Sequence, residues 1–236
     1  MRLPSFFLIA TALMGALHAY IGVRILPDLP VNESWRAAGS ALLVASFLLM
    51  PMSVVSRGIK SQPLSDILAW AGSLFMGLFS SLLMLTLARD AALLGTAVFA
   101  SDETFALVAA RSAVAVPALA VLATLVGFVN ARRRARIKHV DVPIDGLPLP
   151  LHGFIIAQIS DIHVGPTIKR RYLDGIVDAV NGIGADLIAV TGDVVDGSVR
   201  DLAHHTQPLS RLKARHGAYF VTGNHEYYSG APAWTV

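Results

Sequence analysis

The chain has 236 residues, of which 54% are hydrophobic and only 15% charged, with a mean hydropathy of +0.60 and a formal net charge of +3. Soluble domains carry about a quarter of their residues as charged side chains, so this composition excludes an ordinary soluble globular protein. The absence of cysteine fits a cytosolic domain without requiring one.

The hydrophobic excess lies in the first half of the chain. Four apolar stretches occur there, at residues 4–23, 37–56, 67–88 and 112–130. Each is close to the ~20 residues that a helix needs to cross ~30 Å of hydrocarbon. The charged residues are confined to the joints between these stretches, which argues against buried helices of a soluble core. No charged residue lies inside a stretch to mark a transport path. We therefore expect residues 1–130 to form a multi-span α-helical membrane domain of four transmembrane helices.

The first stretch has a second interpretation, because Met1-Arg2 before an apolar run is typical of a cleaved signal peptide. A good small-x-small cleavage site is missing, since Leu17 occupies the third position before a cut after Ala19. An uncleaved first span is therefore the favoured prediction.

Basic residues predict the orientation of the spans. The joint after the second span contains Arg57 and Lys60 against one acidic residue, Asp66, and residues 132–138 after the fourth span contain five basic side chains. The other two joints have no positive excess. The positive-inside rule then predicts that both termini are cytoplasmic.

Residues 131–152 read as a basic juxtamembrane segment followed by a linker. Pro143, Gly146, Pro148 and Pro150 favour an extended tether. The cluster at residues 132–138 also explains the sequence pI of about 9.4, because the rest of the C-terminal region is acidic, so no nucleic-acid partner is implied. The basic residues are interpreted as a topological signal that also attracts the anionic headgroups of the lipid bilayer.

Residues 153–236 change to the pattern of an α/β domain. Short apolar runs at 153–160, 185–191 and 217–222 predict strands, and their near-continuous hydrophobicity is typical of strands buried on both faces. An amphipathic helix is predicted between the first two, from apolar residues at i, i+3, i+4 and i+7: Leu173, Ile176, Val177 and Val180. Residues 199–214 are helical in pattern, with a break and restart at Pro208. The expected order is βαβαβ with a parallel sheet.

Each predicted strand ends in a polar motif. The motifs are Asp161-Ile162-His163, Gly192-Asp193-Val194-Val195-Asp196 and Gly223-Asn224-His225-Glu226. The intervals between them match the length of one strand, crossover helix and next strand, so all three lie at the carboxyl edge of one sheet, where α/β proteins bind ligands. Each motif alone is also typical of a turn. The three in this order predict a metal site for phosphoester chemistry.

The three motifs closely resemble those of the calcineurin-like metallophosphoesterase superfamily, over roughly the last third of the chain. The resemblance implies that Asp161 and His163 bind one metal ion, that Asp193 bridges two, and that Asn224 binds the second. It also implies that the catalytic His225 faces the substrate phosphorus.

Two further motif residues are assigned a smaller role. Asp196 and Glu226 are expected to orient the ligands rather than bind metal. The resemblance implies two divalent ions, and a carboxylate can bridge ions about 3.5–4 Å apart that activate a hydroxide for in-line attack. Oxygen and imidazole donors suit Mn, Fe or Zn.

The resemblance is incomplete at its C-terminal side. Family members supply further metal-binding histidines from a later segment that ends in Gly-His-x-His, and residues up to Val236 contain neither element. We therefore expect residues 153–236 to be the N-terminal part of a phosphoesterase domain in a C-terminally truncated chain.

Four spans before such a domain resemble membrane-bound bacterial members and the group called transmembrane protein with metallophosphoesterase domain. Some relatives cleave the pyrophosphate of UDP-2,3-diacylglucosamine. The resemblance implies a phosphohydrolase of the bacterial inner membrane that cleaves a phosphodiester or pyrophosphate in a membrane-associated or lipid-linked substrate. Two alternatives stay open: a membrane-anchored binding or sensing protein without catalysis, and a cytosol-facing phosphomonoesterase or protein phosphatase.

Overall fold

The structure is a computed structural model that describes residues 5–59 and 61–235. It divides into two compact units, Met1–Arg132 and Arg133–Val236, and each is described by itself. Some residues used in the predictions above lie outside the described residues: Met1, Arg2, Lys60, Val236 and the first residue of the stretch 4–23.

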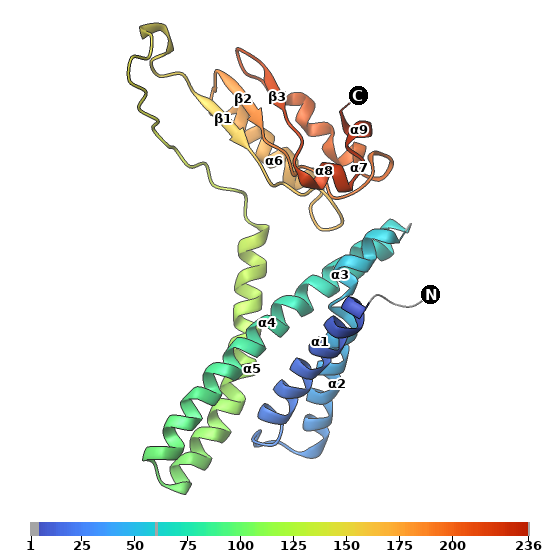
Figure 1. Ribbon diagram of the computed structural model, residues 1–236, viewed down its shortest axis with the longest axis vertical. Helices are drawn as coiled ribbons and strands as arrows, with labels where there is room; N and C mark the ends of the chain where they lie inside the picture. Colours follow the sequence, from blue (N-terminus) through green and yellow to red (C-terminus); the bar gives the residue numbers. More distant parts are fainter. Residues whose placement is uncertain (1–4, 60, 236) are drawn as a thin grey trace. The chain divides into compact units, whose positions relative to one another are not determined.

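The first unit is helical (Figure 1). Its elements are α1 (Ser5–Ile25), α2 (Glu33–Leu49), α3 (Met52–Val55), the short 3-10 turn η1 (Ser56–Gly58), α4 (Gln62–Phe99) and α5 (Asp102–Arg132). Four segments are long and apolar enough to cross a membrane: α1, the run from Glu33 to Gly58, α4 and α5. The predicted helical membrane part is confirmed.

The last two helices are longer than the apolar stretches that predicted them. Helix α4 has 38 residues and α5 has 31, so the expected charged joint between residues 88 and 112 is almost entirely helical. Only Ala100 and Ser101 connect the two helices.

One consequence is that a charged side chain lies inside the helical unit. The Arg89 side chain is only 2% exposed and forms an ion pair with Asp28. Its guanidinium also donates to Ser112 Oγ at 2.9 Å and to the carbonyls of Arg24 at 2.7 Å and Ala109 at 3.1 Å. A buried charge is tolerated when it is paired and hydrogen-bonded in this way. The expectation that Arg89 lies in a joint between two spans was therefore wrong, because it lies inside α4.

The tightest helix contact is made at Gly72 of α4. A Cβ at this position would lie 2.3 Å from the backbone nitrogen of Ser53 and 2.9 Å from the carbonyl oxygen of Leu49. Glycine is therefore required where α4 crosses the end of α2. By contrast, a Cβ at Gly95 of the same helix would meet nothing within 4 Å.

We expect Gly72→Ala to destabilise the helical unit by about 1–3 kcal/mol, because the added methyl overlaps backbone atoms, which can move apart only if the helices shift. The matched change Gly95→Ala has open space and replaces a poor helix former, so it should be neutral or stabilising by up to about 1 kcal/mol. Thermal unfolding in one detergent measures both. Equal midpoints for the two variants would contradict the contact.

The second unit is a small parallel α/β structure. Its elements are η2 (Leu149–Leu151), β1 (Ile156–Ile159), α6 (Arg170–Asn181), β2 (Leu187–Val190), α7 (Val199–Thr206), η3 (Gln207–Arg211), β3 (Ala218–Phe220), α8 (Asn224–Tyr228) and α9 (Ala231–Trp234). The sheet order is β1-β2-β3, with Ile156 opposite Leu187 and Ile188 opposite Ala218. The α/β prediction is confirmed, with strands shorter at both ends than expected.

The predicted helical features of this unit are confirmed. Helix α6 buries Leu173, Val177 and Val180, and the segment after β2 breaks where proline predicts it. There α7 ends at Thr206 and η3 restarts with Pro208 in its first turn.

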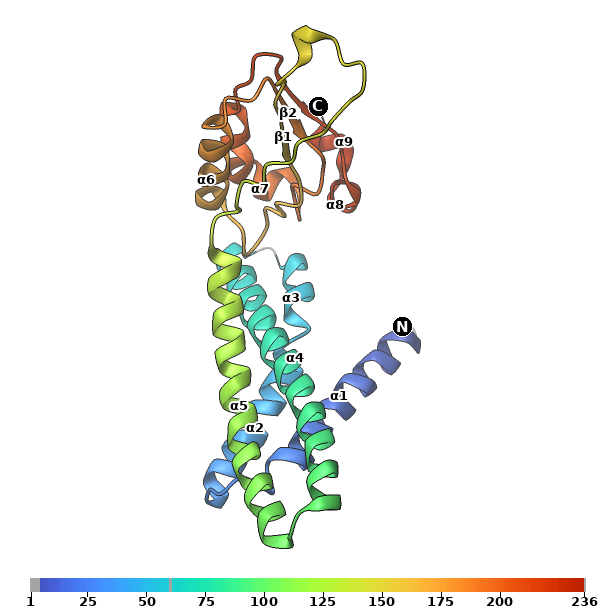
Figure 2. The same ribbon diagram turned by 90° about the vertical axis from the view of Figure 1, so that its left-hand side faces the viewer.

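The core of this unit lies on one face of the sheet. Ala157, Ile159, Ile188 and Val190 point into the cluster that α6 and α7 complete, and Figure 2 shows both helices to one side of the strands. Right-handed crossovers between strands in the order 1-2-3 place both helices on the same face. The opposite face is open in the described residues, since Ile156 is 60% exposed. The prediction that the strands are buried on both faces was therefore wrong.

Candidate metal centre

Backbone hydrogen bonds join the loops that follow β1 and β2. The N–H of His163 donates to the carbonyl of Asp193 at 3.0 Å, and the N–H of Val164 donates to the carbonyl of Val194 at 2.7 Å. In return, the N–H of Asp196 donates to the carbonyl of Val164 at 2.8 Å. These bonds extend the pairing of the two parallel strands past their ends and hold the first two motifs together.

Three residues of these motifs adopt the left-handed backbone conformation. Asp161 has φ 57°, His163 has φ 53° and Asp193 has φ 53°, and they are the non-glycine residues with positive φ in the described part of the chain. This region is unfavourable for residues with a side chain, and such conformations persist only where surrounding contacts enforce them, often at functional sites. All three were predicted from the sequence as metal ligands.

The side chains of these three residues converge. Asp161, His163 and Asp193 each offer one ligand atom, and all three atoms lie within 4.8 Å of one another. Nε2 of His163 is 3.9 Å from Oδ1 of Asp161, and Ser160 Oγ donates to the other carboxylate oxygen, Oδ2, at 2.5 Å. Two carboxylates and an imidazole at this separation fit one divalent cation with oxygen and nitrogen ligands.

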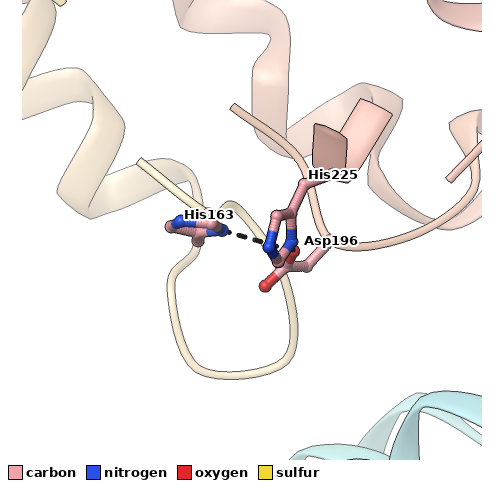
Figure 3. Close-up of side chains that lie close together, drawn as sticks. All are labelled: His163, Asp196 and His225. Atoms are coloured by element: carbon pink, nitrogen blue, oxygen red, sulfur yellow. Dashed lines mark hydrogen bonds and ion pairs between the residues drawn. The ribbon is translucent and has the colours of Figure 1, made fainter. Parts of the chain in front are cut away.

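A second group places one carboxylate between two imidazoles (Figure 3). Oδ1 of Asp196 lies 3.3 Å from Nδ1 of His163 and is also hydrogen-bonded to Nδ1 of His225. The two rings are edge to face with centroids 4.4 Å apart. A carboxylate that accepts from Nδ1 leaves Nε2 of each ring available. Asp196 therefore orients both histidines at once.

The third motif reaches this edge through the start of α8. The N–H of His225 donates to Oδ1 of Asp193 at 2.9 Å, which fixes the position of the predicted bridging carboxylate. Asn224, the first residue of α8, is exposed directly beside this contact. The structure thus brings all seven residues predicted for the site to one edge of the sheet.

Glu226 has a larger part than the sequence indicated. Its side chain is fully buried, and its carboxylate accepts four backbone N–H groups. Oε2 accepts from Gly223 at 2.7 Å and Asp193 at 2.8 Å, and Oε1 accepts from Val194 at 2.7 Å and Val195 at 3.1 Å. Burial alone would raise the pKa of Glu226, but these four donors outweigh it and hold the pKa below its usual value. The ionised carboxylate therefore ties the third motif to the second.

The two motif glycines allow this close approach. A Cβ at Gly192 would lie 2.2 Å from the backbone nitrogen of Gly223, and a Cβ at Gly223 would lie 2.2 Å from Oδ1 of Asp193. The sequence shows glycine directly before Asp193 and before Asn224, but the mutual contact of the two glycines is visible only in the structure. The signal for Glu226 was its place at the third position of a helix, from which it can reach back to the N-terminal N–H groups.

Comparison with known proteins finds similarity to a known family over this region. Residues 154–234 match the model of the calcineurin-like phosphoesterases. A protein of Danio rerio named transmembrane protein with metallophosphoesterase domain is 42% identical over 110 residues, which cover 47% of this chain and 25% of that protein.

Two bacterial relatives extend the comparison. An uncharacterized metallophosphoesterase of Campylobacter jejuni is 26% identical over 227 residues, 95% of this chain and 59% of that protein. Another, from Helicobacter pylori, is 36% identical over 104 residues, 44% of this chain and 27% of that protein. The alignments thus span only part of these relatives' length, about a quarter in the first and last cases. No solved structure matches the chain at comparable significance.

We expect Glu226→Gln to destabilise the second unit by about 2–3 kcal/mol, because the amide nitrogen of glutamine would face backbone N–H groups that need an acceptor. The variant should also lose amide protection at residues 193–195 in hydrogen exchange. The exposed Asp178→Asn on α6 is the matched control. It weakens a surface ion pair with Arg211, so it should cost less than about 1 kcal/mol and leave amide protection at residues 193–195 unchanged.

The difference between wild type and Glu226→Gln also has a predicted pH dependence. The pKa of Glu226 is lower in the folded state, so its contribution is fully present above the unfolded-state pKa of about 4.3. It is lost as the pH falls through the folded-state pKa. A difference in stability that grows on acidification would contradict this assignment.

Proposed function

We propose that this chain, which carries a calcineurin-like phosphoesterase domain in residues 154–234, belongs to a membrane-anchored, metal-dependent phosphohydrolase. The reaction is hydrolysis of a phosphodiester or pyrophosphate bond. The observation that supports it most strongly is the convergence of Asp161, His163 and Asp193 at one sheet edge, with all three backbones in the left-handed conformation.

The donor set assigns residues to two divalent ions. Asp161 and His163 would hold the first ion, Asp193 would serve both, and Asn224 would hold the second. Calcineurin-like phosphoesterases use divalent metal ions, and such ions supply charge neutralisation at the phosphoryl oxygens and activation of water. Mn, Fe or Zn suits these oxygen and imidazole ligands.

His225 supplies the proton chemistry. Its Nδ1 is hydrogen-bonded to Asp196, so Nε2 is the ring nitrogen that faces a substrate. A proton held at Nε2 can be donated to the leaving oxygen as the phosphorus bond breaks, and the Asp196 carboxylate stabilises the imidazolium before that transfer.

A lipid-linked substrate follows from the attachment of the domain. The chain continues from the candidate span α5 into the second unit through a short linker, which raises the local concentration of substrates in the same bilayer. We therefore propose that the substrate is a membrane-associated phosphodiester or pyrophosphate. Compounds of the UDP-2,3-diacylglucosamine type are the most specific candidates. The positive-inside pattern supports a domain on the cytoplasmic face of a bacterial inner membrane.

A membrane-anchored binding or sensing protein is the second candidate. It is favoured by the ligand count for the second ion, because the described residues offer only Asp193 and Asn224 from the predicted set. A site with two ligands binds a divalent ion weakly.

Metal content tests the site. Protein from the complete reading frame should contain about two Mn, Fe or Zn per chain by elemental analysis, and Asp193→Asn should lose most of it because this carboxylate serves both ions. The control is Asp201→Asn, which changes a half-buried carboxylate that is hydrogen-bonded to Ser198 and lies outside the predicted ligand set; it should retain the metal. Little or no metal in the wild type would favour the binding-protein candidate.

Activity separates the catalytic alternatives. With Mn added, bis-p-nitrophenyl phosphate should be hydrolysed faster than p-nitrophenyl phosphate, as expected of a diesterase. The reverse preference would indicate a phosphomonoesterase or protein phosphatase. Turnover of neither compound by the complete protein would count against the whole hydrolase assignment.

Asp196→Asn should lower the rate of diester hydrolysis by about 10–100-fold, the usual effect of removing a carboxylate that orients histidine ligands. Asp201→Asn should keep the wild-type rate. An Asp196→Asn rate equal to that of wild type would show that the paired histidines do not depend on this carboxylate.

A further inference from the structure

The segment that follows α5 lies against α6 in the second unit. The hydroxyl of Tyr172 donates to the carbonyl of Arg133 at 3.4 Å. Gly175 is buried in the middle of α6, and a Cβ there would lie 3.0 Å from Nε of Arg134. Glycine inside a helix is less favourable than alanine. The space above Gly175 is occupied by the Arg134 side chain, which is a physical reason for a glycine at this position.

This contact gathers basic side chains from two parts of the chain. They come from the docked segment and from the start of α6: Arg133, Arg134, Arg136, Lys138, Lys169, Arg170 and Arg171. All are exposed except Lys169, which is half-buried. We call this set the α6 basic face.

Acidic neighbours do not cancel the charge of this face. The acidic residues of α6 are Asp174 and Asp178, and Arg211 pairs with both of them at 2.8 Å. Arg170 also contacts Asp174, at 3.8 Å. Even with Lys169 and Arg170 left out of the count, the face keeps a positive excess from Arg133, Arg134, Arg136, Lys138 and Arg171.

The position of this face in the chain identifies its partner. Arg132 is the last residue of α5, a candidate membrane span, so the segment that begins at Arg133 starts within a few residues of the bilayer surface. We propose that the α6 basic face binds the anionic headgroups of the membrane in which the chain is anchored. Each basic side chain near an anionic surface adds to the attraction.

This binding has a consequence for the metal centre. Helix α6 begins at the carboxyl edge of the sheet, because it follows the loop that starts at Asp161 and His163. Arg134 packs on α6. Headgroups that bind the α6 basic face would therefore orient the whole second unit and not only the segment after α5. The carboxyl edge of the sheet, where α6 begins, would then keep one orientation to the bilayer surface.

Trypsin tests the proposal on the complete protein, because the face consists of residues at which trypsin cleaves. The protein is placed in nanodiscs of phosphatidylcholine alone or mixed with phosphatidylglycerol, and cleavage at residues 133–138 is followed by mass spectrometry. The exposed Arg200 is the internal reference. We expect cleavage at 133–138, relative to Arg200, to be about tenfold slower with phosphatidylglycerol, and high salt should remove this protection.

Charge reversal on α6 separates a docked face from a flexible basic tail. The double variant Lys169→Glu, Arg171→Glu should lose most of the protection at residues 133–138. The matched variant Lys213→Glu, Arg215→Glu should retain it, and an unchanged Arg200 rate shows that each variant is folded.

Three results would overturn the proposal. They are equal cleavage of the wild type in both lipids, full protection in the Lys169→Glu, Arg171→Glu variant, and equal protection by soluble glycerol phosphate in phosphatidylcholine discs. None of these readouts depends on hydrolysis, so they stand apart from a failure of the proposed activity.

Discussion

The carboxylate of Glu226 is the interaction on which the arrangement of the candidate metal centre depends. It accepts N–H groups from the loop after β2 and from the start of α8, so one buried charge joins two segments that are far apart in the sequence. Hydrogen bonds to a buried carboxylate are stronger than those between neutral groups. The same carboxylate is expensive to bury without donors. These two facts together explain why the loops adopt one geometry.

The left-handed backbones of Asp161, His163 and Asp193 follow from that constraint. Each is unfavourable alone, yet the backbone bonds between the two loops and the carboxylate of Glu226 leave little freedom. Asp196 then acts on the side chains as Glu226 acts on the backbone, because it accepts from both His163 and His225. The ligands are held in place by protein contacts before any ion is considered, which is the preorganisation that metal-assisted hydrolysis requires.

Much of this arrangement was predictable from the sequence, because motifs at strand ends and βαβ spacing determine which residues share a sheet edge. The contact between Gly192 and Gly223 and the four bonds of Glu226 were not predictable, since they depend on how two loops pack. The helical region shows the same limit. Hydropathy located the four long helices, but it ended α4 at residue 88, because a charged residue stops an apolar run. A charged residue does not end a helix when it is paired, and Arg89 is paired with groups on neighbouring segments.

We propose that the loops after β1 and β2 bind a metal ion through Asp161, His163 and Asp193. Pulsed electron paramagnetic resonance on the Mn²⁺-loaded complete protein tests it most directly, because a coordinated imidazole nitrogen modulates the echo of the bound ion. If His163 binds the ion, the wild type shows a nitrogen coupling that weakens in His163→Gln. The variant His204→Gln on α7 leaves this coupling unchanged. An undiminished nitrogen coupling in His163→Gln, or bound Mn²⁺ without any nitrogen coupling, would contradict metal binding through His163.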